Sequence, residues 1–122
     1  MISMTNGYGL DCPIAFALDV IGERWSVLIL RDLFRIGPRR FIDLQSSLVG
    51  IAPNTLSARL KTLEAGGVIA SRIYERHPPR LEYYLTEQGR QLGPVLKSLR
   101  AWGERYATPE HLDADTPSSS SH

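Results

Sequence analysis

FIDLQSSLVGIAPNTLSARLKTL, residues 41–63, contains two short amphipathic patterns on either side of a glycine. Apolar residues recur at positions 41, 44 and 48 in the first pattern and at 56, 60 and 63 in the second. This spacing predicts two helices, each with one buried stripe. Gly50 can adopt the left-handed conformation that ends a helix, and Pro53 suits the first turn of the next one. The segment therefore predicts a helix-turn-helix, with its second helix over about residues 53–65.

The outer face of that second helix carries small side chains that can form hydrogen bonds. A solvated surface helix is more often rich in Glu and Lys, whereas a helix that enters a DNA groove needs short polar groups. We expect the residues at or beside this face to contact DNA: Asn54, Thr55, Ser57, Ala58, Lys61 and Thr62. Arg59 lies nearer the apolar stripe, where it can pair with a phosphate or an acid as well as read a base. The alternative is a surface helix of another small bundle.

Basic residues concentrate in the middle of the chain, although its 122 residues have a formal net charge of only +1. Residues 35–80 contain eight Lys and Arg against three acids, whereas residues 104–122 contain four acids and one Arg. This division favours a polyanion as the partner of the basic centre. Arg39 and Arg40 precede the first helix of the motif, whose exposed N–H groups also attract anions, so a phosphate site is predicted there. An ordinary solvated turn is the alternative.

Two further helices are predicted before the motif, over about residues 12–21 and 23–34. The second is strongly apolar, and Gly37 and Pro38 end it. Four of its residues recur at helical spacing and are predicted to form the centre of the core: Trp25, Leu28, Ile29 and Leu33.

A β-hairpin is predicted after the motif, with strands over residues 68–75 and 81–85, because apolar and polar residues alternate there. Residues 76–80 join them, and their two prolines cannot donate ladder hydrogen bonds, so we expect a protruding loop. A hairpin in this place is typical of the wing of a winged helix, here over about residues 68–85. Arg76, His77 and Arg80 are candidates for contact with the DNA backbone or minor groove. Simple solvation of these side chains is the alternative.

A final helix is predicted over about residues 87–106, with Thr86 as its N-cap. Its apolar residues follow a three–four spacing: Leu92, Val95, Leu96, Leu99, Trp102 and Tyr106. A helix added to a closed core has little surface of its own chain to cover, so we expect it to dimerise with a second copy; packing within one subunit is the alternative. Residues 1–10 are expected to be flexible and residues 108–122 disordered, which leaves one domain over residues 11–107.

The composition argues against several other classes of protein. The longest aliphatic run is four residues, Val27 to Leu30, which is too short to span a membrane. The N-terminus lacks the features of a signal peptide, so a cytoplasmic location is expected. The single cysteine, Cys12, excludes an intrachain disulfide and a cysteine-based zinc site. No catalytic or phosphate-loop motif surrounds the three histidines or the glycines, so we expect no enzyme, metal or cofactor.

The order of these elements resembles the HxlR-type family of bacterial transcription regulators over about residues 11–106. Six segments carry the resemblance: CPI (12–14), VIGERW (20–25), LILRDL (28–33), GPRRF (37–41), LSARLK (56–61) and the hairpin RIY…PPRLEYYLT (72–86). The resemblance implies a mainly α fold with a small β-hairpin, a winged helix-turn-helix that dimerises through its first and last helices. It also implies a homodimer that binds double-stranded DNA at palindromic operators as a repressor or an activator, of which we expect a repressor.

The same resemblance draws attention to Cys12. Several members of the family sense quinones, aldehydes, diamide or hypochlorite through a cysteine at this position. A helix start favours the thiolate, whereas the neighbouring charge of Asp11 opposes it. Two interpretations stay open: a sensor of electrophiles or oxidants, and an inert thiol at the dimer seam.

Two positions depart from the family pattern. Ala52 stands where Ser is frequent, so the side-chain cap of the second motif helix is missing. Asn54 stands where Arg or Lys is frequent, which predicts a different operator because Asn favours adenine edges and Arg favours guanine. The expected function is thus that of a sequence-specific DNA-binding regulator. The alternatives are a winged-helix protein-interaction module without DNA binding and a regulator gated by a small ligand.

Overall fold

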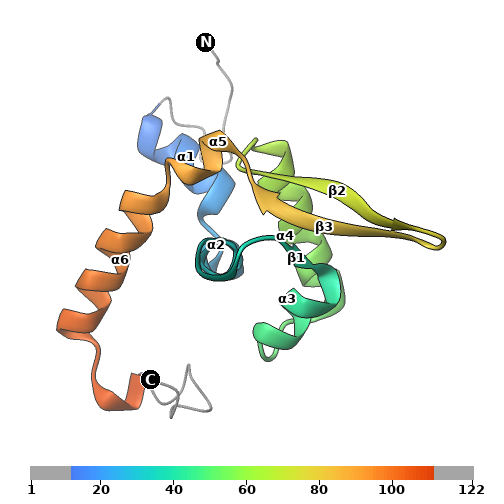
Figure 1. The fold of residues 1–122 in the computed structure, drawn as a ribbon. Coiled ribbons are helices and arrows are strands. Elements are labelled where there is room, and N and C mark those ends of the chain that lie inside the picture. The colour runs from blue at the N-terminus through green and yellow to red at the C-terminus, as the bar shows by residue number, and fades with distance from the viewer. Residues whose placement is uncertain (1–11, 112–122) are drawn as a thin grey trace. The chain divides into compact units, whose positions relative to one another are not determined.

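The structure, a computed structural model, describes residues 12–111 (Figure 1). The chain divides after Leu92 into two compact units. The first unit contains α1 (Pro13–Ile21), α2 (Arg24–Ile36), β1 (Arg39–Arg40), α3 (Phe41–Ser47), α4 (Pro53–Ala65), β2 (Ile69–Arg76), β3 (Pro79–Leu85) and α5 (Glu87–Arg90), and the second contains α6 (Gly93–Tyr106). The predictions for residues 1–10 and 112–122 lie outside the described residues. Residues 109–111 form a helical turn, so the predicted disorder is wrong for these three.

The core lies in the first unit, around α2, which contacts α1, α3, α4, β1 and β3. Ile29 and Leu33 are buried as predicted, and Leu30 joins them with no exposed surface. Trp25 and Leu28 are only half-buried, so the predicted centre of the core is wrong for these two residues. The buried face of α2 is centred on residues 29, 30 and 33, because the surrounding helices and strands pack against that side of the helix.

The predicted helix-turn-helix is present as α3, a short turn and α4. Leu56, Leu60 and Leu63 are buried, which confirms the second apolar stripe, and Leu44 and Leu48 of the first stripe are buried while its Phe41 is half-buried. Gly50 lies in the turn with a φ of 96°, a left-handed value that residues other than glycine rarely adopt. α4 coincides with the predicted helix over residues 53–65.

The start of α4 lacks a side-chain cap, as the sequence predicts. Ala52 is the N-cap residue, its backbone is extended, and no side-chain hydrogen bond is made there. The carbonyl of Ala52 still accepts the N–H of Leu56, and Pro53 occupies the first turn, where its missing N–H leaves no donor unpaired. The start of α4 is therefore stabilised by a backbone hydrogen bond and by Pro53, without a side-chain cap.

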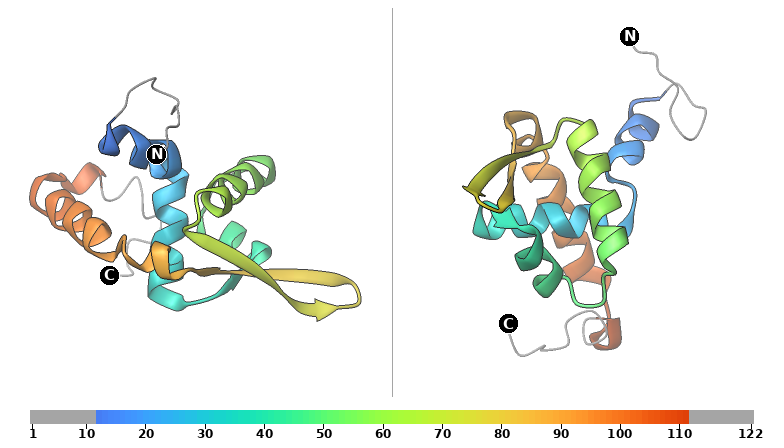
Figure 2. Two further views of the ribbon diagram at one scale, coloured as in Figure 1. Left: turned by 90° about the horizontal axis from the view of Figure 1, so that it is seen from above. Right: turned by 90° about the vertical axis from the view of Figure 1, so that its right-hand side faces the viewer.

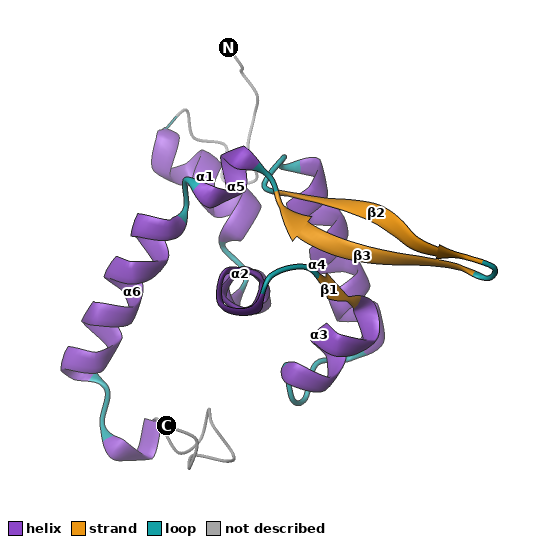
Figure 3. Ribbon diagram, in the orientation of Figure 1, coloured by secondary structure: helices purple, strands orange, loops and turns teal. Residues whose placement is uncertain are grey.

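The hairpin belongs to a three-stranded antiparallel sheet with the order β1-β3-β2 (Figure 3). Ile69 pairs with Leu85 and Ser71 with Tyr83, which is the predicted alternation. The strand β1 was not predicted, because two consecutive arginines show no alternation of apolar and polar residues. Its pairing with β3 places Arg40 opposite Glu82. The hairpin extends well beyond the helices of the first unit in Figure 1 and in the left view of Figure 2.

The predicted loop over residues 76–80 is wrong in extent. Only His77 and Pro78 form the turn, and β3 already begins at Pro79, which pairs with Arg76. Near the turn β3 has β2 on one side only, since β1 reaches no further than Glu82. A proline is tolerated in such an edge position because its nitrogen needs no partner strand.

The predicted single helix over residues 87–106 is also wrong, because the structure has two helices, α5 and α6. Pro94 explains the break: within one continuous helix its ring would collide with the carbonyl of Arg90, four residues earlier. The predicted cap at Thr86 is confirmed, since its hydroxyl oxygen accepts the N–H of Gly89. The same hydroxyl donates to the carbonyl of Gly67 at 2.6 Å, which ties α5 to the start of β2.

Candidate nucleic-acid interface

α4 presents two different faces. Its inner face is buried through Leu56, Leu60 and Leu63. Its outer face is formed by the exposed residues Asn54, Ser57, Ala58 and Lys61, with Thr55 and Thr62 half-buried at its margins. The side chains predicted to read DNA therefore lie together on the solvent side of one helix.

Two of the α4 residues predicted to contact DNA already have partners within the chain. Arg59 is half-buried, and its Nη1 lies 3.4 Å from Oε2 of Glu23, the residue that precedes α2. Of the roles left open for Arg59, the structure provides the pairing with an acid. Thr62 donates its hydroxyl to the carbonyl of Ala58 at 3.1 Å, so only its oxygen lone pairs and methyl group remain for other contacts.

The inner side of the sheet supports α4. Ser71 on β2 donates its hydroxyl to Oε2 of Glu64 on α4 at 3.1 Å. Tyr83 lies beside this contact on β3, and burial, followed by the charge of Glu64, raises the pKa of its phenol above 10.0. The predicted reading helix is thus held from behind by leucines and by a polar contact to the sheet.

Arg39 and Arg40 both contact Asp43 in the first turn of α3, Arg40 at its carboxylate and Arg39 at its backbone carbonyl. The backbone N–H and the Nε of Arg40 donate to Oδ2 of Asp43 at 3.2 and 3.3 Å. Arg39 donates from Nη2 to the carbonyl of Asp43 at 3.1 Å. The hydrogen bond from the Arg40 backbone is the main reason why the pKa of Asp43 lies below its usual 3.8. The helix start predicted to hold a phosphate therefore already holds an anion of the chain itself.

The side chains at the end of the wing are exposed. Arg76 and His77 make no hydrogen bond or ion pair with any described residue. Arg80 lies 3.5 Å from Glu75 across the hairpin, and both side chains are about half exposed. Exposed pairs of this kind contribute little to stability, so Arg80 can exchange Glu75 for a phosphate at low cost.

The sequence reasoning missed a polar cluster on the outer side of the sheet. Arg72 forms an ion pair of 2.8 Å with Glu82 and stacks over the ring of Tyr84 at 4.8 Å. Arg40 donates from Nη1 to the hydroxyl of Tyr74 at 3.2 Å. The sequence does contain a sign of this cluster: Arg72 and Tyr74 alternate with the apolar residues of β2, on the side opposite Ile69 and Ser71.

Apolar residues of α1 are exposed. Ile14 is 70% exposed and Phe16 is 51% exposed, whereas Ala15 is buried. Cys12 is the N-cap residue of this helix and is half-buried, and its thiol is free. These large apolar side chains of α1 are therefore not covered by the rest of the first unit.

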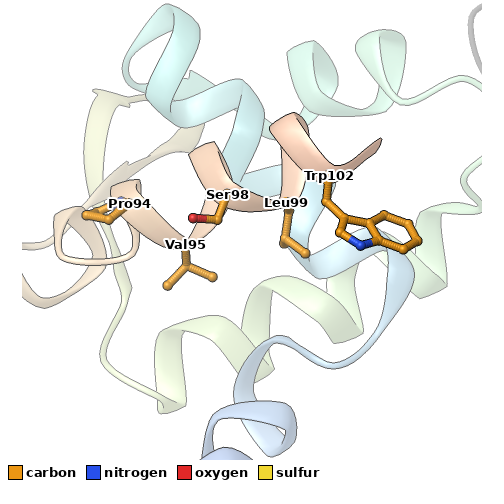
Figure 4. Close-up of a pocket in the computed structure, with 5 residues that line it drawn as sticks. All are labelled: Pro94, Val95, Ser98, Leu99 and Trp102. Atoms are coloured by element: carbon orange, nitrogen blue, oxygen red, sulfur yellow. The ribbon is translucent and has the colours of Figure 1, made fainter. Parts of the chain in front are cut away.

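The second unit shows the same feature more strongly, since no residue of α6 is buried. Trp102 is 67% exposed and Leu99 is 51% exposed, and the Trp102 ring lies 5.1 Å from that of Tyr106. A hollow on α6 is lined by Pro94, Val95, Ser98, Leu99 and Trp102, and Figure 4 shows Val95 and Leu99 on the same side of the helix. Of the other predicted dimerisation residues, Leu92 and Leu96 are half-buried.

In residues 12–111 no group of three or more His, Cys, Asp or Glu side chains is placed to hold a metal ion. No helix in this range is long and apolar enough to cross a membrane.

The family model for HxlR-like helix-turn-helix proteins matches residues 20–111. This chain belongs to that family. A helix-turn-helix transcriptional regulator of Synechocystis is 40% identical over 105 residues, covering 86% of this chain and 77% of the relative. The regulator YdeP of Bacillus subtilis is 39% identical over 95 residues, covering 78% of this chain and 73% of YdeP.

Solved structures agree with this membership. The redox regulator HypR in its reduced form has a TM-score of 0.72 and 35% identity, covering 77% of this chain and 92% of HypR. YodB of Bacillus subtilis in its reduced form has a TM-score of 0.68 and 31% identity, covering 82% of this chain and 98% of YodB. The HxlR-like chain described here is therefore a helix-turn-helix transcriptional regulator with a winged helix-turn-helix fold.

Proposed function

We propose that this HxlR-like regulator binds DNA sequence-specifically as a homodimer on a palindromic operator. The observation that carries the proposal is the outer face of α4, where Asn54, Ser57, Ala58 and Lys61 are exposed while three leucines behind them are buried. Short polar side chains on a rigidly supported helix suit contact with base edges in the major groove. Asn54 can form a paired hydrogen bond with adenine, and Lys61 can reach guanine or a nearby phosphate.

Positive charge beside this face supports the same proposal. Lys61 and Arg76 are exposed and make no ion pair with a described residue, so both are free to contact phosphates. Arg80 has an exposed partner, Glu75, that a phosphate can replace, the part-exposed Arg39 and the exposed Arg40 can take a phosphate beside their contacts with Asp43, and His77 lies beside Arg76 at the turn. Phosphate contacts position a protein on DNA and supply most of its affinity, while base contacts select the sequence.

The homodimer is proposed from the bare apolar faces of α1 and α6. Large apolar side chains that stay exposed along two helices mark an interaction surface. A second copy of the chain carries the same faces, so a two-fold symmetric pairing can cover both at once. A dimer also places two copies of α4 about 34 Å apart, one turn of DNA. Such a dimer can exclude other proteins from its operator, so we propose repression in the bacterial cytoplasm, where DNA lies.

Modification of Cys12 is proposed as the signal that changes operator affinity. HypR is a redox regulator with structures in reduced and oxidized forms, and YodB has a diamide-treated form. Cys12 is half-buried at the start of α1, beside the exposed Ile14. A group added to its sulfur would alter the face proposed for the dimer.

The cysteine proposal is tested with quinone-treated wild type and Cys12→Ser. We expect treatment to change operator affinity in the wild type and to leave Cys12→Ser unchanged. Equal responses of the two proteins would show that Cys12 is the inert thiol of the alternative interpretation.

The DNA-binding proposal is tested by selecting bound duplexes from a random pool with the purified protein. We expect enrichment of a two-fold symmetric sequence that is released at high salt. A protein-interaction module without DNA binding would enrich no sequence and would not be retained on random DNA at low salt. A regulator gated by a small ligand would enrich the same sequence only when its ligand is present, or only when the ligand is absent.

A further inference from the structure

β2 contains a β-bulge at Tyr74. Ile73 pairs with Leu81 and Glu75 pairs with Arg80, so two steps along β2 correspond to one step along β3. Tyr74 is the residue without a partner on β3. A bulge bends its strand, increases the local twist and turns the extra side chain in a new direction.

The bulge separates two parts of the hairpin that are supported differently. Ile69 and Leu85, at the base, are buried, and β1 pairs with β3 at Glu82 and Tyr83. Beyond the bulge, residues 75–80, here named the wing tip, are all exposed and are paired only with one another. The direction of the wing tip therefore depends on the geometry at Tyr74.

Tyr74 is connected to the helix-turn-helix through Arg40. The guanidinium of Arg40 donates from Nη1 to the Tyr74 hydroxyl at 3.2 Å, and its central carbon lies 5.1 Å from the centre of the Tyr74 ring. The same guanidinium donates from Nε to Asp43 at 3.3 Å, in the first turn of α3. One planar side chain thus joins the bulge to α3, the first helix of the helix-turn-helix, and a lysine could not make both contacts in this geometry.

We propose that Arg40, Asp43 and Tyr74 form a brace that fixes the direction of the wing tip relative to the helix-turn-helix. Tyr74 is then a positioning residue: it orients Arg76 and Arg80 toward the DNA and touches no base itself. The inference rests on the proposed DNA binding for its consequence, although the brace itself belongs to the free protein.

The brace is tested first without DNA, by backbone NMR order parameters at residues 75–77 and 80. Tyr74→Phe removes only the hydroxyl that Arg40 contacts. We expect the order parameters of the wing tip to fall from about 0.85 toward 0.6 or less, with the rest of the first unit unchanged. Arg40→Lys should have the same effect.

Tyr84→Phe is the matched control, because it also removes a tyrosine hydroxyl from the outer face of the sheet. Within the described structure the Tyr84 hydroxyl has no hydrogen-bond partner, and its ring stacks under Arg72. We expect wild-type order parameters for this variant. An unchanged wing tip in folded Tyr74→Phe, or equal changes in both variants, would overturn the brace.

The consequence for DNA is tested by combining Tyr74→Phe with Arg76→Ala on the selected operator. We expect Arg76→Ala to weaken binding about tenfold in the wild type and less than about threefold in Tyr74→Phe, since a misdirected tip has little contact to lose. Multiplicative effects of the two substitutions would overturn the positioning role. If the wild type binds no DNA, the proposed function fails, and the order parameters still decide whether the brace exists.

Discussion

α4 and α6 are helices of 13 and 14 residues with the same three–four spacing of apolar residues, but only one of them has its apolar face covered. Leu56 and Leu63 of α4 have no exposed surface, whereas Leu99 and Trp102 of α6 are more than half exposed. α4 completes the core of the first unit and leaves its polar face for a ligand. The apolar face of α6 is not covered within its own unit, and we propose a second copy of the chain as its partner.

The difference shows that an apolar stripe predicts burial without saying which chain provides the cover. For α4 the cover is present in the same unit, through α2 and β2. For α6 it is not, and we therefore assign its face to a second copy. One helix thus contributes to stability within a chain, and the other is proposed to contribute to association between chains.

The largest expected effect separates these two contributions. Leu60→Ala in α4 should lower the free energy of unfolding by about 3 kcal/mol, because it leaves a cavity in the core. Leu99→Ala in α6 is the matched change, and it should cost less than about 1 kcal/mol at concentrations where the chain is monomeric. Urea unfolding of both variants measures the difference. Equal losses would contradict the division between the two helices.

The next effect concerns association. Leu99→Glu places a charge in the proposed interface and should weaken self-association about 100-fold. Lys97→Glu places the same charge on the other side of α6 and serves as the control, with an association close to that of the wild type. Sedimentation velocity over a range of concentrations measures both. The interface is misplaced if Leu99→Glu still dimerises like Lys97→Glu.

The polar faces of the two helices can be compared in the same way. Lys61 and Lys97 are both exposed and make no ion pair with any described residue. Lys61→Ala should weaken operator binding about tenfold and reduce the salt dependence by about one ion, since a phosphate contact is lost. Lys97→Ala should leave both quantities unchanged. Fluorescence anisotropy at several salt concentrations distinguishes them, and identical behaviour would remove Lys61 from the interface.

The smallest expected effect is a pH dependence of the unfolding free energy that comes from the first turn of a helix. α4 and α6 have no acid in their first turn, whereas α3 has Asp43 with a lowered pKa. Since the folded state lowers this pKa, the stability it contributes is present above pH 3.8 and is lost as the pH falls through the lower folded value. The difference in unfolding free energy between wild type and Asp43→Asn should therefore shrink from about pH 6 to about pH 2. A constant difference would show that Asp43 acts without its charge.

The sequence was sufficient for the parts of the fold that depend on local patterns. The stripes of α3 and α4, the turn at Gly50 and the cap at Thr86 follow from spacing and residue type, and the structure has all of them. The split between α5 and α6 was also present in the sequence, as Pro94, but the apolar spacing on both sides of it favoured one long helix.

Other features depend on contacts between distant segments, which a single sequence does not display. β1 exists because β3 lies beside Arg39 and Arg40. Glu23 is recognisable as the partner of Arg59 only after α2 and α4 have packed. The bulge at Tyr74 depends on the register of β2 against β3, and the extent of the turn at His77 depends on the same pairing.

The most direct test changes the distance between the two half-sites of the selected operator. With half-sites one DNA turn apart, we predict two copies of the chain per duplex and tight binding; inserting about five base pairs should weaken binding at least about 100-fold, since the second copy of α4 would face away from the groove. Binding of one copy per duplex with the same affinity at both spacings would contradict the account.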